Sequence, residues 1–297
     1  MRKLTAHLAM TVAALALTVV PARGQFHVVG IGSGFTSVNG VNDNGQFVGS
    51  QANLGNQPVL GFSFPGGSGL SMVPVSILLT QTGASNVTAN GVNNQRAVVG
   101  NYTDIFGSHG FMQPSPSTFP TTIDFSGASQ TIASAINDSG EIVGYYITGS
   151  TFNGFQDIGG TLATLGPPGA TSTQIFGINN AGQITGTYSG GDCSAGSCGF
   201  IYQSGTFTQI TAPGAISTSV YGISNSGVVV GQYSTSLATH GFSDSGGVFT
   251  NVDAPFCDPG TTVVMAANIS GELVGNCTKT VPDTLGGTIV LGFVFKP

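Results

Sequence analysis

The sequence predicts an all-β fold, a six-bladed β-propeller made of four-stranded repeats of about 44 residues. Three observations predict it. A twelve-residue motif recurs six times, a Gly-Phe pair follows each copy, and the chain after residue 24 has no helical hydrophobic period. Repeats of about 40 to 50 residues are typical of propeller blades.

The motif and the Gly-Phe pair alternate without a gap. The first copy of the motif reads "GVNDNGQFVGSQ", and the closing glycines of successive copies are 51, 44, 42, 45 and 44 residues apart. These glycines are Gly49, Gly100, Gly144, Gly186, Gly231 and Gly275. The pairs are Gly61-Phe62, Gly110-Phe111, Gly154-Phe155, Gly199-Phe200, Gly241-Phe242 and Gly292-Phe293.

Each repeat carries the signals of four short strands. In the fifth repeat "TSVYGIS" and "VVVGQYS" flank the turn signal "NSG", and "HGFSD" follows a short loop. In the fourth repeat "GFIYQSGTFTQI" holds two strands that "SG" joins so tightly that they must be antiparallel neighbours. The four strands of a repeat are therefore expected to form a meander.

The "N-[ND]-x-G" core of the motif predicts a hairpin turn between the first and second strands. Its glycine takes φ > 0 without steric cost, and its Asn or Asp bonds nearby backbone. Arg96 replaces this glycine in the second repeat, so that turn is expected to differ. The closing glycine marks a close backbone approach or a bulge, and the sequence leaves both open. The turn residues predicted to be structural are Asn42, Gly45, Asn93, Asn137, Gly140, Asn179, Gly182, Asn225, Gly227, Asn268 and Gly271.

The two ends of the chain predict how the ring closes. The last repeat stops at "LGFVFKP" and lacks a fourth strand, whereas "GQFHVVGI" is a strand with no repeat before it. Pairing of residues 25–31 with residues 289–296 would complete the last blade and protect its open edge. A solenoid of the same repeats is the alternative. It requires atypical capping repeats, which are not seen.

Residues 1–24 have the features of a secretory signal peptide: a basic start, an apolar run over 8–20 and small residues near Gly24. Residues 25–297 are then expected to form one propeller domain, outside the cell or in the periplasm. No later run is long and apolar enough to span a membrane. The mature chain has three basic and twelve acidic residues, a net charge of −9. This charge excludes nucleic acid as a partner and disfavours anionic lipid.

The four cysteines are even in number in a chain with an export signal, so disulfides are expected. Three pairings are possible. In the predicted meander, the connections that carry the cysteines emerge on one face, which favours Cys193 with Cys198 and Cys257 with Cys277. A metal site is the alternative, but the chain has no CxxC pair.

The repeated elements resemble the HAF-type extracellular repeats of secreted bacterial proteins. The resemblance rests on the motif "GIN-x-x-G-x-I-x-G-x-Y", on "HGF" at 109–111 and 240–242, and on "PGA" at 168–170 and 213–215. It covers the whole mature chain, although "LGF", "NGF" and "CGF" replace "HGF" in other repeats. The resemblance implies an exported repeat protein and carries no catalytic residue.

No convergent catalytic set or cofactor site is apparent, so no cofactor is expected. The motif is interpreted as a plain turn rather than a calcium loop, because most copies lack the carboxylates that calcium loops use. Of the histidines His27, His109 and His240, the last two belong to the repeat signature, which favours a structural role. The recurring tyrosines are expected to pack between blades, and they are Tyr102, Tyr146, Tyr188 and Tyr233.

The sequence therefore favours a secreted, non-catalytic binding or scaffold module whose protein or glycan ligand is unknown. Its variable connections, such as "SQANLGNQPV", are the expected binding regions. The alternative is an extracellular polysaccharide hydrolase or lyase, with Asp43, Asp138 and Glu141 as the motif-borne carboxylates. A structural envelope protein that assembles with itself is a weaker third hypothesis.

Overall fold

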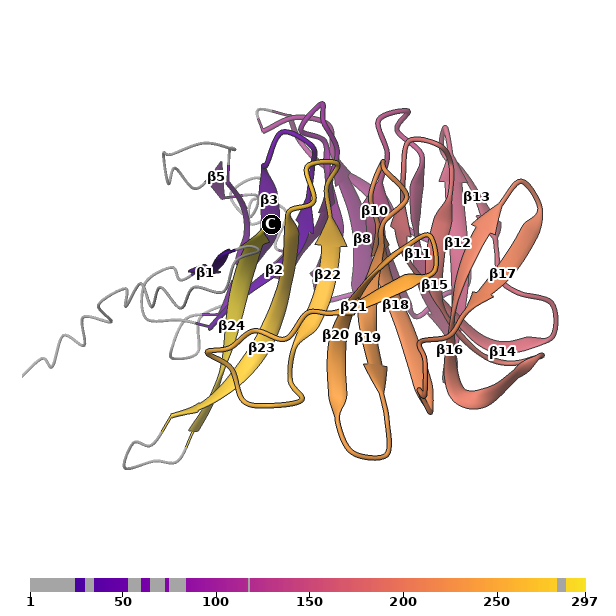
Figure 1. Cartoon of the computed structure of the whole chain (residues 1–297). Helices are drawn as coiled ribbons and strands as arrows, with labels where there is room; N and C mark the ends of the chain where they lie inside the picture. Colours follow the sequence, from indigo (N-terminus) through magenta and orange to yellow (C-terminus); the bar gives the residue numbers. More distant parts are fainter. Residues whose placement is uncertain are drawn as a thin grey trace, which may run out of the picture.

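The structure, a computed structural model, describes residues 25–29, 35–52, 60–64, 73–74, 84–116, 118–281 and 287–297. Within these ranges the regular elements are strands, and none of them forms a helix that could span a membrane. The sheets stand side by side and face one another (Figure 1). The chain is thus all-β and propeller-like. The predicted signal peptide lies outside the described residues.

The first three repeats each supply four strands in meander order. The first contains β2 (Phe35–Val41), β3 (Phe47–Ala52), β4 (Leu60–Phe64) and β5 (Val73–Pro74). The second contains β6 (Ser85–Val92), β7 (Val98–Thr103), β8 (Ser108–Gln113) and β9 (Thr121–Ile123). The third contains β10 (Gln130–Ile136), β11 (Ile142–Thr148), β12 (Thr151–Ile158) and β13 (Thr161–Thr164).

The last three repeats continue the pattern. The fourth contains β14 (Ala170–Ile178), β15 (Ile184–Gly190), β16 (Cys193–Gln203) and β17 (Thr206–Ile210). The fifth contains β18 (Ser217–Ile223), β19 (Val229–Ser234), β20 (Thr239–Ser245) and β21 (Val248–Asn251). The sixth contributes β22 (Val263–Ala267), β23 (Leu273–Val281) and β24 (Gly287–Lys296).

The N-terminal strand β1 (Gln25–Val29) supplies the fourth strand of the last sheet. It pairs antiparallel with β24, from Gln25 opposite Lys296 to Val29 opposite Gly292. This is the pairing predicted from the ends of the chain. Residues 30 and 31 of the predicted strand lie outside the described part.

The first and last repeats pack on each other without sharing a paired strand. The Val38 amide donates to Asn276 Oδ1 at 2.7 Å, and Asn276 Nδ2 donates to the Val38 carbonyl at 3.1 Å. Gly292 lets the Val38 side chain approach, because a Cβ at Gly292 would lie 2.7 Å from Val38 Cγ2. Residues 238 positions apart in the sequence are therefore neighbours.

The described strands do not form six separate sheets, one for each repeat. The second and third repeats belong to one eight-stranded sheet, joined by a single parallel pair between Gln130 of β10 and Ser108 of β8. The described strands therefore group into five sheets. The sequence carried no signal for this single pair.

The closing glycine of the motif and the phenylalanine of the Gly-Phe pair face each other across neighbouring strands. Gly144 of β11 is paired with Phe155 of β12, whose side chain is fully buried. A Cβ at Gly144 would overlap the Ile132 carbonyl and lie 2.9 Å from the Phe155 ring. The closing glycine thus marks a close approach. The first strand of each repeat carries a bulge instead, as between Ala133 and Ala135.

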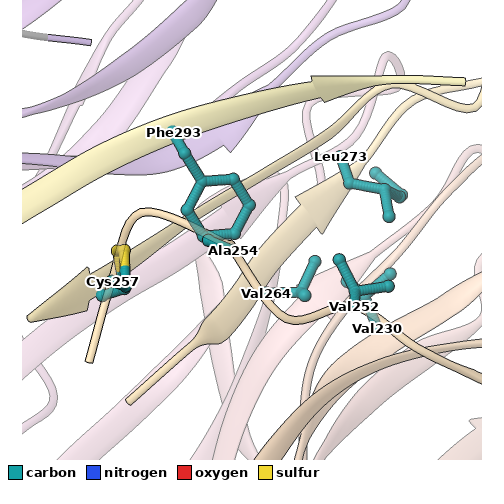
Figure 2. Close-up of a cluster of buried hydrophobic side chains, with 9 residues drawn as sticks. Val230, Val252, Ala254, Cys257, Val264, Leu273 and Phe293 are labelled. Atoms are coloured by element: carbon teal, nitrogen blue, oxygen red, sulfur yellow. A yellow bond between two sulfur atoms is a disulfide. The ribbon is translucent and has the colours of Figure 1, made fainter. Parts of the chain in front are cut away.

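The hydrophobic core lies between neighbouring sheets rather than in one central mass. Figure 2 shows one such cluster, in which Val230 from the fifth repeat packs against Val264, Leu273 and Phe293 from the sixth. Similar clusters combine each of the other neighbouring pairs that the described residues include. Stability therefore depends on each repeat having its neighbours in place.

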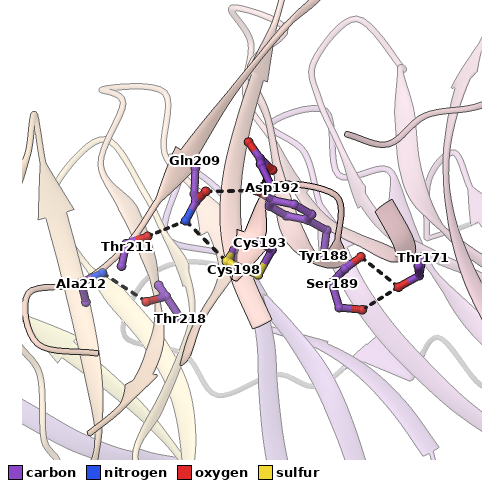
Figure 3. Close-up of a disulfide and its surroundings, with 10 residues drawn as sticks. All are labelled: Thr171, Tyr188, Ser189, Asp192, Cys193, Cys198, Gln209, Thr211, Ala212 and Thr218. Carbon is purple, nitrogen blue, oxygen red and sulfur yellow. Dashed lines mark hydrogen bonds between the residues drawn. A yellow bond between two sulfur atoms is a disulfide. The ribbon is translucent and has the colours of Figure 1, made fainter. Parts of the chain in front are cut away.

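Both favoured cysteine pairs form disulfides. Cys193 and Cys198 clip the hairpin between β15 and β16, with Cα atoms 5.8 Å apart (Figure 3). Cys257, in the connection between β21 and β22, is joined to Cys277 of β23 with a Cα separation of 6.0 Å. The predicted pairing is confirmed.

Candidate functional site

The candidate site is the axial channel that the innermost strands of the six repeats surround. Two small cavities lie there, one of about 60 Å³ among the motif turns and one of about 70 Å³ between the strands. A girdle of apolar side chains lines both cavities and separates them. It consists of Val41, Val92, Ile136, Ile178, Ile223 and Ala267.

The motif asparagine organises its own turn. In the second repeat, Asn93 Oδ1 accepts hydrogen bonds from the amides of Gln95 at 3.1 Å and Ala97 at 2.9 Å. The same two bonds recur around the other motif asparagines, which are Asn42, Asn137, Asn179 and Asn268. The glycines Gly45, Gly140, Gly182, Gly227 and Gly271 have positive φ. Arg96 takes the same conformation at φ 69°, so the expectation that the turn of the second repeat differs is wrong.

The same asparagines also link neighbouring repeats. Asn93 Nδ2 donates to the Asn137 carbonyl at 3.1 Å, and equivalent bonds start from Asn42, Asn137, Asn179 and Asn268. The bond from Asn268 reaches the Asn42 carbonyl and so joins the last repeat to the first. We call this set the asparagine ring. It has one gap, at Ser224, whose hydroxyl accepts from the Val228 amide but has no amide group to donate onward.

Asn225, which the sequence analysis grouped with the motif asparagines, lies one position beyond Ser224. It belongs to a second ring at the channel mouth, which we call the mouth ring: Asp43, Asn94, Asp138, Asn180, Asn225 and Ile269. In this ring, the backbone amides of five members donate to the side-chain oxygen of the next, as from Asn94 to Asp138 at 2.8 Å, whereas Ile269 has no oxygen to accept from Asn225. The ring was missed in the sequence because its chemistry changes from repeat to repeat.

Amide side chains surround the two carboxylates of the mouth ring. Asn94 Nδ2 donates to both Asp43 Oδ2, at 3.1 Å, and Asp138 Oδ2, at 2.8 Å. Asn225 and Asn180 donate to the same two oxygens at 2.6 Å. Burial raises the pKa of Asp43, but the hydrogen bonds from Asn225, Asn94 and the Ile269 amide outweigh it and hold that pKa below its usual value. Asp43 is therefore ionised at neutral pH.

Asp43 does not fit the role of the general acid in a catalytic carboxylate pair. Because both carboxylate oxygens accept from Asn94 Nδ2, at 3.1 and 2.8 Å, they lie within about 6 Å of each other. This separation is below the ~10 Å beyond which an inverting pair would be excluded. However, a general acid needs a raised pKa, and that of Asp43 is lowered. Glu141 lines neither cavity and instead accepts from Asn137 and Gln156. Within the described ranges, no group of three or more His, Cys, Asp or Glu side chains could hold a metal.

The cavity of about 70 Å³ between the strands, which we call the inner cavity, is lined in each repeat by the residue directly before the motif. No role was predicted for this position from the sequence. The first three repeats place Asn39, Asn90 and Ser134 there. The last three repeats place Phe176, Tyr221 and Met265 there. The signal that could have revealed this position is its variation between repeats, since the motif that follows it is nearly constant. We call these six positions the channel column.

The histidines and tyrosines of the repeats are tied within their own sheets. The Tyr102 ring packs on His109 at 5.3 Å, and Tyr233 packs on His240 at 5.4 Å. The hydroxyls of Tyr102 and Tyr146 bond to threonines of the outermost strand of the same repeat. This latch within each repeat accompanies the expected packing between repeats, because Tyr102, Tyr146 and Tyr188 also belong to the buried clusters that join neighbouring repeats.

His109 predicts a pH-dependent loss of stability. Its ring nitrogens bond to Asp124 at 3.0 Å and to Asp104 at 3.1 Å. Burial lowers the pKa of His109, but both carboxylates outweigh it, and the pKa is raised above 6.5. The protonated His109 ring therefore stabilises the fold, and this contribution is fully present below the pKa of the unfolded state. It is lost as pH rises through the pKa of the folded state. Urea unfolding at pH 5.5 and 8.5 should show a larger fall for wild type than for His109→Gln. An equal fall would contradict the prediction, with His27→Gln as the control.

Comparison with known proteins identifies the fold type. No protein-family model and no curated protein matches the chain. TolB from Acinetobacter baumannii is similar at 11% identity, with a TM-score of 0.55 over 85% of this chain and 64% of that chain. This chain thus spans less than two thirds of TolB.

A protein of unknown function from Dyadobacter fermentans is similar at 10% identity, with a TM-score of 0.54 over 91% and 95% of the two chains. A fucose-recognising lectin from Aleuria aurantia, itself a six-bladed β-propeller, has a TM-score of 0.46 and 12% identity over 88% and 91%. At such low identity the likenesses to TolB and to the Dyadobacter fermentans protein show the fold alone. The chain is an all-β protein of the propeller type.

Proposed function

We propose that this chain is an exported, six-bladed β-propeller of the HAF-repeat type that acts as a non-catalytic binding module. Residues 1–24 are its signal peptide and residues 25–297 its single domain. The pairing of β1 with β24 supports closure of the last blade by the N-terminal strand. The bonds from Asn268 to Asn42 and from Asn276 to Val38 support a closed ring over a solenoid, whose first and last repeats would lie apart.

The observation that carries the binding function is that the residues that build each repeat are nearly constant, whereas the residues that line the channel vary. The motif asparagines, the closing glycines and the buried phenylalanines repeat almost without change, and they hold the inner strands in fixed positions. The channel column and the mouth ring vary on this frame. Varied polar and aromatic side chains on a rigid scaffold are where binding residues usually lie.

The surroundings fit an exported protein with a protein or glycan ligand. Two disulfides persist in oxidising compartments such as the periplasm or the extracellular medium. The channel mouth offers both hydrogen-bond donors and acceptors, as hydroxyl-rich or peptide ligands require. The lowered pKa of Asp43 argues against that residue as a general acid.

A thermal-shift screen of residues 25–297 tests this function. The panel contains soluble glycans, peptides and calcium, and a ligand at 100 times its Kd should add about 2.7 kcal/mol to the free energy of unfolding. A shift by a glycan or peptide, without release of new reducing ends from a glycan, is the expected result. Polysaccharide turnover that Asp43→Asn abolishes would overturn the proposal. So would a complete absence of binding across the panel.

A further inference from the structure

We propose that the face of the ring away from the motif turns binds a basic protein segment that carries apolar side chains. This face, which we call the loop face, contains the connections between the second and third strands of each repeat and those between successive repeats. Neighbouring strands are antiparallel, so these connections lie at the opposite end of each sheet from the motif turns. The β19–β20 turn, for example, lies at the lower end of its sheet in Figure 1. The inference goes beyond the proposed function of the channel, because it concerns a different surface.

Two turns of the loop face carry the most exposed large apolar side chains of the described residues. Ile105 and Phe106, between β7 and β8, are 91% and 84% exposed, and Leu237, between β19 and β20, is 95% exposed. Phe106 and Leu237 occupy equivalent positions, each three residues before the histidine of an "HGF" element. Large apolar side chains that gather on one face of a soluble protein mark an interaction surface.

Both turns are held in one conformation by a side chain at their first position. Asp104 Oδ1 accepts from the amides of Phe106 at 2.7 Å and Gly107 at 3.2 Å. In the equivalent turn, Thr235 Oγ1 accepts from the Leu237 amide at 3.2 Å. A turn that is already ordered loses little conformational entropy when a partner covers it. The two tips are therefore suited to act as anchors.

The apolar surface of the fifth repeat extends toward the fourth. Ile216, directly before β18, is 58% exposed, and its amide donates to the Ser234 carbonyl at 2.8 Å, next to the turn that carries Leu237. Its carbonyl accepts from the Gly196 amide of the disulfide hairpin. Leu237 and Ile216 thus come from neighbouring connections that hydrogen bonds hold together.

The charge of the loop face selects the partner. Its described residues include one lysine, Lys279, which pairs with Asp258 at 3.4 Å. Against this lysine stand five carboxylates, so the net charge is −4 when the histidines are neutral. The five are Asp104, Asp124, Asp192, Asp253 and Asp258.

The carboxylates lie beside the apolar tips and stay ionised. The hydrogen bond from the Phe106 amide lowers the pKa of Asp104, which belongs to the same turn. The side chains of Asp124 and Asp253 are 50% and 45% exposed, and each bonds to the histidine that follows a tip. Such a surface attracts a basic partner and speeds its association, whereas a bilayer with anionic lipids is repelled.

The two tips lie on opposite sides of the channel in the proposed ring. They belong to the second and fifth repeats, which are three positions apart among six. A partner that crosses the loop face contacts both, and the second contact then forms at a high effective concentration. Loss of one tip should therefore weaken binding, and loss of both should abolish it.

Selection from a random peptide library displayed on phage, with residues 25–297 as the target, tests the partner class. We expect the enriched peptides to combine Lys or Arg with Phe, Leu or Ile. Synthetic copies of these peptides should bind about tenfold more weakly to Phe106→Ser and to Leu237→Ser, and undetectably to the double variant. Raised salt should weaken their binding to wild type, because the attraction is between exposed charges.

Val248→Ser is the matched control. Val248 is 67% exposed at the start of β21, at the end of the sheet where the motif turns lie, and its loss should leave the affinity unchanged. The tip side chains and Val248 are exposed, so all of these variants should unfold in urea as wild type does.

Three results would overturn the inference: no enriched peptide, enriched peptides without basic residues, or equal binding to the double variant and wild type. Sedimentation with vesicles of phosphatidylcholine tests the other use of apolar tips. Binding of wild type but not of the double variant to these neutral vesicles would assign the tips to a membrane and also overturn it.

The channel function is judged separately. A ligand from the thermal-shift screen that stabilises the double variant as much as wild type acts away from the loop face and supports the proposed function, whatever the peptide selection yields.

Discussion

Gly144→Ala is expected to lower the free energy of unfolding by about 3–5 kcal/mol, a large effect for the addition of one methyl group. The added Cβ would overlap the Ile132 carbonyl on the neighbouring strand and come within 2.9 Å of the buried Phe155 ring. Backbone is the closest obstacle, so rotation of a side chain cannot relieve the overlap. The strand pair β10–β11 would have to separate.

Gly287→Ala is the matched control. Gly287 is also a strand glycine, at the start of β24, but a Cβ there would meet nothing within 4 Å and its φ is not positive. We expect this change to be neutral or slightly stabilising, because alanine restricts the unfolded chain. Urea unfolding followed by circular dichroism measures both variants. Equal stability of the two would show that the closing glycine of the motif is not a packing requirement.

The fold was largely predictable because its most constant residues have local causes. A glycine at positive φ and an asparagine that bonds its own turn are needed in every repeat, so they recur at a fixed spacing. The strand at the N-terminus was predictable because "GQFHVVGI" has no repeat of its own. The disulfides followed once the meander placed the cysteines on one face.

The candidate site was less predictable because it lies in what the repeats do not share. Asp43 and Asp138 were visible as carboxylates, but their amide neighbours Asn94 and Asn225 come from other repeats and meet them only at the axis. The channel column was passed over for the same reason. Phe176 and Asn90 occupy equivalent positions in their repeats but differ in chemistry. A search for residues that recur at the repeat spacing therefore does not find them.

The asparagine ring also shows that one side chain can stabilise both its own turn and the contact with the next repeat. The Oδ1 atom of Asn93 completes the turn within its repeat, whereas Nδ2 of the same side chain binds the next repeat. Local sequence patterns reveal the first role, since it spans four residues. They cannot reveal the second, which joins residues 44 positions apart.

Asn93→Ala is expected to destabilise the protein by about 3 kcal/mol. Asn93 is 6% exposed, and loss of its side chain removes three hydrogen bonds of about 1 kcal/mol each. Asn93→Asp separates the two roles, because a carboxylate still accepts from the Gln95 and Ala97 amides but cannot donate to the Asn137 carbonyl. We expect it to retain the turn and lose about 2 kcal/mol through the unmet carbonyl.

Ser224→Asn is the reverse experiment, at the one gap in the asparagine ring. Its new amide group should donate to the Asn268 carbonyl as its equivalents do elsewhere, and should add about 1 kcal/mol to the free energy of unfolding. Urea unfolding of all three variants gives the comparison. If Ser224→Asn stabilises and Asn93→Asp destabilises, the bonds between repeats hold the ring together. If both are neutral while Asn93→Ala is not, the asparagines act only within their own turns, and packing between the sheets alone closes the ring.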